Sequence, residues 1–330
     1  MKPVKFLIII FVVASNLHCS ITDPNKPGEV IKLRYGWYPG ILASVQYHHV
    51  KTRKMPGQQS GTVQFQGNFQ IRTKEHPNGL QIDGEGGVLE MDDENNAIAQ
   101  HKFEGFIQRL AEVNPSFIID KKGTLQEIVR FDEFRQTVEQ ETSKLLPKKA
   151  GQPFLNTQLF LDRFASREQV LSMLLENWNR DVGQWVDSEL EQGQTYRVET
   201  KRPMYLLGDV EVLNVGHYEY MGRVPCDQAD QKSSCVKLYF HCKVDEDSAK
   251  SAFRSIFNDI GIDKFGEMGV NIIGGLGVNI LYDLELITEE RTLLPHYIKE
   301  TKLVDLEGMQ HGFKFEKQDL KEIQYTYLER

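Results

Sequence analysis

The sequence lacks any apolar run long enough to cross a bilayer as a helix. The longest run, Phe6 to Ala14, is about half of the roughly 20 residues that a spanning helix needs, and no later segment approaches it. Charge of one sign is not concentrated either, because 39 Lys and Arg and 47 Asp and Glu give a net charge of -8 without a long block. A protein with this net negative charge would repel the phosphate backbone of a nucleic acid. We therefore expect neither a membrane-spanning helix nor a nucleic-acid partner.

Motifs that carry chemistry are also missing. No Gly-x-Ser-x-Gly or Ser-x-x-Lys pattern places a nucleophile, and the spacing of zinc ligands is absent. The glycines of 274–277 lack the Lys-Ser/Thr ending of a P-loop and precede an alternating segment, which favours a bent strand. His48 and His49 would point to opposite faces of a strand, and we interpret His49 as a core histidine. The sequence thus predicts no catalytic residue, cofactor or metal, and favours a protein that is not an enzyme.

The first 20 residues have the order of an export signal. Lys2 and Lys5 precede the apolar run, and a short polar stretch follows it. We therefore expect the mature chain to be exported and to reside in the periplasm.

Cys19 stands where a bacterial lipoprotein carries its acylated cysteine, and residues 1–20 resemble bacterial lipoproteins in this respect. His18 and Asn16 depart from the lipoprotein pattern. Two alternatives stay open: lipidation of Cys19 with anchoring to the outer membrane, and ordinary cleavage after Ser15.

Setting Cys19 aside leaves three cysteines, Cys226, Cys235 and Cys242. Cys226 and Cys235 flank a polar loop that reads as a connection between two strands, and an oxidising compartment favours a disulfide between them. Cys242 lies in phase with the apolar side chains of its strand, which predicts a buried thiol.

Period-two alternation is the clearest pattern in the chain. It runs through Gly61–Arg72, Val236–Asp245 and Leu276–Leu286, each with one apolar and one polar face. Such strands are typical of antiparallel sheets with one face covered and one solvated. Further strands are expected at 30–35, 41–53, 80–83, 101–110, 116–120, 125–131, 194–200, 208–223, 294–304, 312–316 and 322–328. A change of apolar phase between Val212 and Leu213 predicts a bulge.

Three helices are predicted among these strands, at Asp132–Leu146, Arg167–Val186 and Ser248–Ile260. The second carries a Leu and Trp stripe at helical spacing that should pack against a sheet. Its start, Ser166-x-x-Gln169, has the form of a capping box.

These elements predict an α+β protein with a large, mostly antiparallel, curved sheet, like a half-barrel, and about three packed helices. The expected divisions are a signal peptide (1–20), a flexible tether (21–29), an N-terminal β-meander lobe with a helix (30–146), a joint (147–156) and a C-terminal lobe of helix and strands (157–330). The two lobes can share one continuous sheet.

An exported chain of meandering strands with an intervening Trp-bearing helix resembles the half-barrel of LolA-like lipid-carrying lipoproteins. The segment Glu290–Pro295 also looks like a strand-to-strand element of uncharacterised exported proteins of this kind. The resemblance implies a concave sheet with a hydrophobic ligand or lipid as its partner.

Aromatic side chains on the predicted apolar faces are the candidate lining of an apolar cavity, with a filled core as the alternative. They are Phe65, Phe69, Trp178, Trp185, Phe240, Phe253 and Phe257. The sequence therefore favours an exported, envelope-associated protein that binds a hydrophobic ligand. The alternatives are a structural or interaction component of the envelope without a ligand and, least favoured, a hydrolase.

Overall fold

The structure, a computed structural model of the chain, describes residues 28–54, 60–93, 115–145, 165–203, 211–227, 233–259, 276–308 and 314–329. The predicted signal peptide with Cys19, most of the tether, the joint at 147–156 and the strand expected at 101–110 lie outside these ranges.

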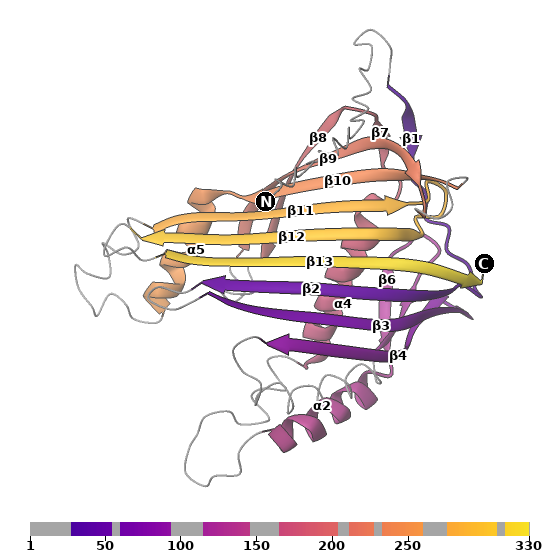
Figure 1. Cartoon of the computed structure of the whole chain (residues 1–330), viewed down its shortest axis with the longest axis horizontal. Helices are drawn as coiled ribbons and strands as arrows, with labels where there is room; N and C mark the ends of the chain where they lie inside the picture. The colour runs from indigo at the N-terminus through magenta and orange to yellow at the C-terminus, as the bar shows by residue number, and fades with distance from the viewer. Residues whose placement is uncertain are drawn as a thin grey trace, which may run out of the picture.

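In the described ranges, one antiparallel sheet of 11 strands forms the body of the structure (Figure 1). In spatial order it contains β6 (Leu125–Val129), β5 (Ser116–Ile119), β4 (Gly79–Asp93), β3 (Gly61–His76), β2 (Leu42–Lys54), β13 (Lys314–Glu329), β12 (Pro295–Gly308), β11 (Leu276–Thr288), β10 (Ser234–Val244), β9 (Glu211–Pro225) and β8 (Thr195–Pro203). Its edge strands β6 and β8 do not pair with each other, so the sheet is open. The predicted α+β class with a large curved antiparallel sheet is confirmed.

Pairing of β2 with β13 joins the beginning of the chain to its end at the middle of the sheet. A separate two-stranded sheet pairs β1 (Val30–Lys32) with β7 (Glu189–Glu191). Residues distant in sequence are therefore neighbours across the central strands.

Figure 1 shows the sheet from its convex side, with the helices of the concave face behind it. The helix α4 (Arg167–Asp181) covers one half of the concave face, and α5 (Glu246–Asp259) lies at the opposite end of the long strands. The third helix, α2 (Phe131–Leu145), lies beyond the β4 side of the sheet. Within the described ranges, no helix combines the length and apolarity needed to span a bilayer.

The main core lies between α4 and the concave face. Inward side chains of the alternating strands, such as Leu238, Leu284 and Ile298, are fully buried there. Trp178 and Trp185 approach them from the helix side. Burying such side chains stabilises the fold by about 1.5 to 3 kcal/mol each, which fixes α4 on this half of the sheet.

The helix α4 begins as the sequence predicts, because the hydroxyl of Ser166 accepts a hydrogen bond from the backbone N–H of Gln169 at 3.2 Å. It ends earlier than predicted, at Asp181. A short 3-10 turn, η1 (Gly183–Trp185), follows and brings the indole of Trp185 into the core, where it is fully buried.

The predicted disulfide is present, since Cys226 and Cys235 are bonded. The thiol of Cys242 is half-buried rather than fully buried, and it packs against the main core. The bulge predicted at Val212 is not found there, because β9 pairs with β8 in continuous register through this point. The register shifts instead beside Leu238 of β10.

Candidate functional site

A band of charged residues crosses the concave face between two apolar clusters. On β12, Ile298 belongs to the main core and Val304 to a second cluster that includes Ala249 and Ala252 of α5. Between them, at the inward positions of the same strand, lie Glu300 and Lys302. The inward side chains of β12 are therefore apolar at Ile298, charged at Glu300 and Lys302, and apolar again at Val304.

The charged band is built by three adjacent strands and the end of α4. It comprises His49, Lys51 and Arg53 of β2, Lys317, Asp319 and Lys321 of β13, Glu300 and Lys302 of β12, and Arg180 and Asp181 at the end of α4. The strand residues recur at every second position, so they point to the same face as their core neighbours. Register places Lys321 between His49 and Glu300, and the next inward residue, Asp319, between Lys51 and Lys302.

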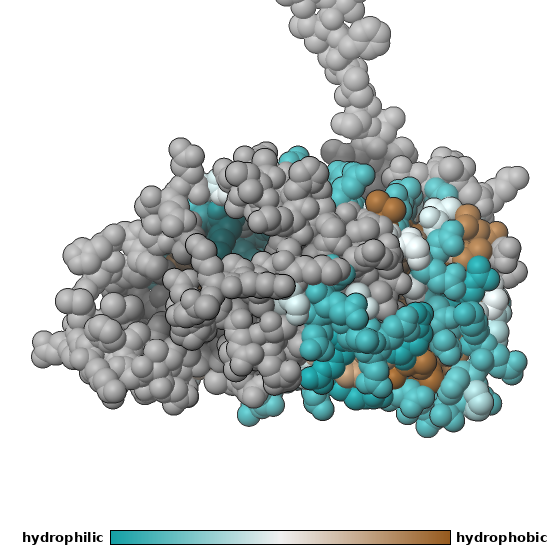
Figure 2. Space-filling view, turned by 90° about the horizontal axis from the view of Figure 1, so that it is seen from below, coloured by the Kyte–Doolittle hydropathy of each residue, from teal (hydrophilic) through white to brown (hydrophobic). Residues whose placement is uncertain are grey.

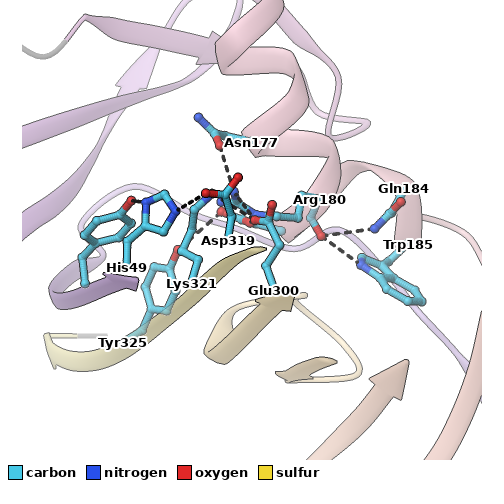
Figure 3. A network of polar contacts seen from close by, with 11 residues as sticks. His49, Asn177, Arg180, Gln184, Trp185, Glu300, Asp319, Lys321 and Tyr325 are labelled. Carbon is cyan, nitrogen blue, oxygen red and sulfur yellow. Dashed lines mark hydrogen bonds and ion pairs between the residues drawn. The ribbon is translucent and has the colours of Figure 1, made fainter. Parts of the chain in front are cut away.

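Arg180 anchors the end of α4 to the sheet through this band (Figure 3). Its guanidinium contacts the carboxylate of Asp181, donates to Oδ1 of Asn177 at 2.9 Å and pairs with Oε2 of Glu300 at 3.1 Å. Its carbonyl accepts the indole N–H of Trp185 at 3.2 Å. The Arg180 side chain is 9% exposed, so these partners compensate a charge taken out of water.

Glu300 of β12 links the end of α4 to the neighbouring strand β13. Its Oε2 also accepts a hydrogen bond from Nζ of Lys321 at 3.0 Å. Burial favours the neutral acid, but Lys321 and Arg180 outweigh it and lower the pKa of Glu300. Glu300 is therefore a carboxylate held between two cations, one on the helix and one on the sheet.

Asp319 sits at the middle of the band. Nζ of Lys317 lies 2.7 Å from its Oδ2, and Nε2 of His49 lies 3.7 Å from its Oδ1. Although burial raises the pKa of Asp319, His49 and Lys317 lower it well below the ordinary range. The other ring nitrogen of His49 is 2.8 Å from the hydroxyl of Tyr47. His49 is buried, as predicted, but it contacts charge as well as core.

Four cations surround Asp319, and we call Lys51, Arg53, Lys302 and Lys317 the basic patch. Lys317 pairs with Asp319. In the described part of the chain, no carboxylate lies within ion-pair distance of Lys51, Arg53 or Lys302. The patch therefore carries more positive than negative charge, in a protein whose net charge is -8.

Two of these cations lie beside an aromatic ring instead of a carboxylate. Nζ of Lys51 lies 5.1 Å from the ring centre of Phe65, and the guanidinium carbon of Arg53 lies 5.5 Å from that of Phe315. Seen from below, the molecule has a hollow toward the end where β2 finishes and β13 starts, and the described atoms at its floor are hydrophilic (Figure 2).

The structure separates the predicted cavity-lining aromatics into different environments. Trp178, Trp185 and Phe240 are at most 5% exposed and belong to the main core. Phe69 is half-buried against that core, whereas the half-buried Phe65 lies beside the charged band. Phe253 and Phe257 are in α5, where the described side chains end at Ala252.

The charged band was missed by sequence reasoning. A usable signal was present, because Lys51, Arg53, Lys317, Asp319 and Lys321 occupy the phase that is apolar elsewhere in their strands. Charge in the inward phase of a strand indicates either a paired network or a ligand site.

A pocket of about 680 Å³ opens at the other end of the sheet. Tyr35 and Trp37 form its aromatic side and pack edge-on against Trp178 at 5.9 and 5.3 Å between ring centres. His76 and Asp120 contribute polar lining. The Tyr35 hydroxyl is buried without a hydrogen-bond partner in the described part of the chain, and burial raises its pKa.

No protein-family model matches the chain, and no curated protein is similar to it. Among solved structures it is similar to lipovitellin, from a study of lipid-protein interactions, with 11% identity and a TM-score of 0.39 over 88% of this chain. The chain spans 25% of the lipovitellin chain. It is also similar to DynF from the dynemicin pathway of Micromonospora chersina (9% identity, TM-score 0.20, 91% of this chain and 86% of that chain). An outer membrane channel from Pseudomonas putida F1 matches at 7% identity and a TM-score of 0.21, over 88% of this chain and 97% of that one. At these scores we draw no functional conclusion from the likeness.

Proposed function

We propose that this protein is exported and holds a hydrophobic ligand, such as a lipid chain, against the concave face between α4 and α5. The observation that carries the proposal is a difference along one face. Under α4 the inward side chains are fully buried, as at Leu238 and Leu284. On the other side, α5 buries part of the face, including Val278 and Val304. Beside and beyond the charged band, however, the apolar side chains of Phe65 and Phe315 are only half-buried.

Further half-buried apolar side chains extend this surface. Val63 precedes Phe65 at the next inward position of β3, and Leu306 pairs with Phe315 across β12 and β13. Apolar area left in contact with water costs about 25 cal/mol per Å², so a ligand chain that covers these side chains gains free energy. A concave surface also encloses a ligand better than a flat one.

The export part of the proposal is supported by the disulfide Cys226–Cys235, because such bonds persist in oxidising compartments. It fits the signal-like order of residues 1–20. Anchoring through Cys19 stays a prediction, and mass analysis of the mature N-terminus tests it.

The ligand proposal is tested with a matched pair of double variants. Phe65→Ala with Phe315→Ala removes apolar surface from the concave face. Val50→Ala with Leu320→Ala removes half-buried apolar side chains that pair on the convex face. Binding of a fluorescent fatty acid is measured, and native mass spectrometry detects lipid that purifies with the protein.

The concave-face variant is expected to bind the probe about tenfold more weakly or worse, whereas the convex-face variant keeps the wild-type affinity. Equal losses in both variants contradict the proposal. No probe uptake and no bound lipid in the wild type favours a structural or interaction component instead. If Trp37→Ala abolishes binding and neither double variant does, the ligand binds in the pocket beside Tyr35 instead.

A further inference from the structure

The basic patch has a regular geometry that follows from strand register. Lys51, Asp319 and Lys302 lie opposite one another on β2, β13 and β12. Lys317 lies opposite Arg53 one inward position further along. Adjacent strands are about 4.8 Å apart, and inward positions along a strand are about 6.7 Å apart. Four cationic side chains therefore rise from an area about 10 Å wide.

Three lysines on the convex face of the same sheet have a different arrangement. Nζ of Lys237 lies 2.9 Å from Glu285, Lys299 pairs with Glu322 at 3.7 Å, and Lys54 pairs with Glu316 at 3.7 Å. These cations have carboxylate partners although they also face solvent. On the concave face, Lys51, Arg53 and Lys302 have none in the part of the chain that the structure describes.

The carboxylate of Asp319, which lies among the four cations of the patch, does not neutralise them. Asp319 pairs with Lys317, so the patch retains three positive charges at neutral pH. Arg180 and Lys321 are already matched by Asp181 and Glu300, which leaves the excess at Lys51, Arg53 and Lys302. Like charges gathered on a concave surface repel one another, and a bound anion relieves that repulsion.

We propose that the basic patch binds the anionic group of an amphipathic ligand whose acyl chain lies on the apolar surface beside it. This inference rests on the proposed function and adds the ligand's charge. The guanidinium of Arg53 offers two parallel N–H donors to a carboxylate or phosphate, and the lysines add point charges. Phe65 and Phe315 lie directly beside Lys51 and Arg53, so the anionic and apolar ends of one ligand have adjacent partners.

The test compares three probes that share one acyl chain. Palmitate carries a carboxylate, lysophosphatidate carries a phosphate monoester, and palmitoyl glycerol is neutral. The folded full-length protein and two triple variants are titrated with each probe. One variant is Lys51→Gln with Arg53→Gln and Lys302→Gln. The control, Lys54→Gln with Lys243→Gln and Lys299→Gln, removes the same charge from the convex face.

The wild type is expected to bind the anionic probes about tenfold or more tightly than the neutral one. The patch variant should lose this preference and keep its affinity for palmitoyl glycerol, and the control should keep both. The preference should weaken as salt rises from about 0.1 M to about 1 M. A higher affinity for one of the two anions supports the proposal and identifies the acid group that the patch accepts.

Two results would overturn the inference without touching the proposed function. One is equal affinity of the wild type for all three probes, and the other is an unchanged preference in the patch variant. If the patch variant does not fold, the exchange Lys51→Arg with Arg53→Lys and Lys302→Arg keeps the charge and must keep the preference. If none of the probes binds to the wild type, the proposed function itself fails.

Discussion

The two halves of the concave face share one sheet and one alternation pattern but differ in what covers them. Under α4, inward side chains such as Leu238 and Tyr220 are fully buried, and Trp185 fills the space between helix and strands. Beside and beyond the charged band, Phe65 and Phe315 are half-buried next to cations that have no carboxylate partner among the described residues. The half under α4 uses its apolar surface to stabilise the fold, whereas the other half is packed only in part, against α5, and leaves apolar and charged side chains partly exposed around Phe65 and Phe315.

Arg180 and Glu300 mark the boundary between the halves. They compensate the charges at the end of α4 where it meets the sheet. Alternation in a strand therefore specifies which residues face inward, but not whether the inward face is packed.

Replacement of Trp185 by Ala should lower the free energy of unfolding by about 3 to 5 kcal/mol, because it leaves a large cavity under α4. Trp185 is fully buried and its ring centre lies 5.2 Å from that of Tyr218. Phe65→Ala, on the other half, should cost about 1 kcal/mol or less. Urea unfolding measures both. Similar losses in the two variants would show that the halves are packed alike.

Replacement of Arg180 by Met should cost about 3 to 5 kcal/mol, because Asp181 loses its cation and Glu300 keeps only Lys321. Adding Asp181→Asn and Glu300→Gln to the same chain should recover part of this loss, since no uncompensated carboxylate remains. Thermal and urea unfolding of the single and triple variants provide the measurement. No recovery in the triple variant would assign the loss to packing of the Arg180 stem instead of charge.

Removal of the disulfide by Cys226→Ala with Cys235→Ala should cost about 2 to 3 kcal/mol, the value expected for a loop closed over a sequence separation of 9. Ligand affinity should not change, because neither cysteine belongs to the charged band. Unfolding and probe titration are compared with the wild type. A loss of affinity without a loss of stability would contradict the placement of the ligand.

Replacement of Asp319 by Asn should cost about 1 to 2 kcal/mol at neutral pH. Because the pKa of Asp319 is lowered by folding, its contribution is complete above the ordinary aspartate pKa of about 4 and is lost as pH falls through the folded value. The difference in stability between wild type and variant should therefore shrink in acid. A difference that stays constant from about pH 7 to about pH 3 would contradict a role for the ionised carboxylate.

Much of the fold could be predicted from the sequence because it depends on local patterns. Alternation in Gly61–Arg72 and Leu276–Leu286 placed β3 and β11, and the cap at Ser166 placed the start of α4. The polar loop between Cys226 and Cys235 indicated the disulfide. Each of these signals lies within one element or between adjacent elements.

The candidate site could not be predicted in the same way. Lys51 and Lys302 are about 250 residues apart in sequence and meet only because β2 and β12 both pair with β13. The order of strands, with the first half joined to the last strand, is decided by long-range pairing that no local pattern encodes. The early end of α4 at Asp181 is likewise set by where Arg180 and Trp185 find partners on the sheet.

Local sequence patterns specify which residues prefer strands, which side of each strand is apolar and where the long helix begins, because these properties follow from period, propensity and capping. The tertiary structure alone decided which inward residues are packed, which charges are matched and which cations share one surface. Burial and ion pairing depend on distances between segments, and those distances are fixed only when the strands have paired.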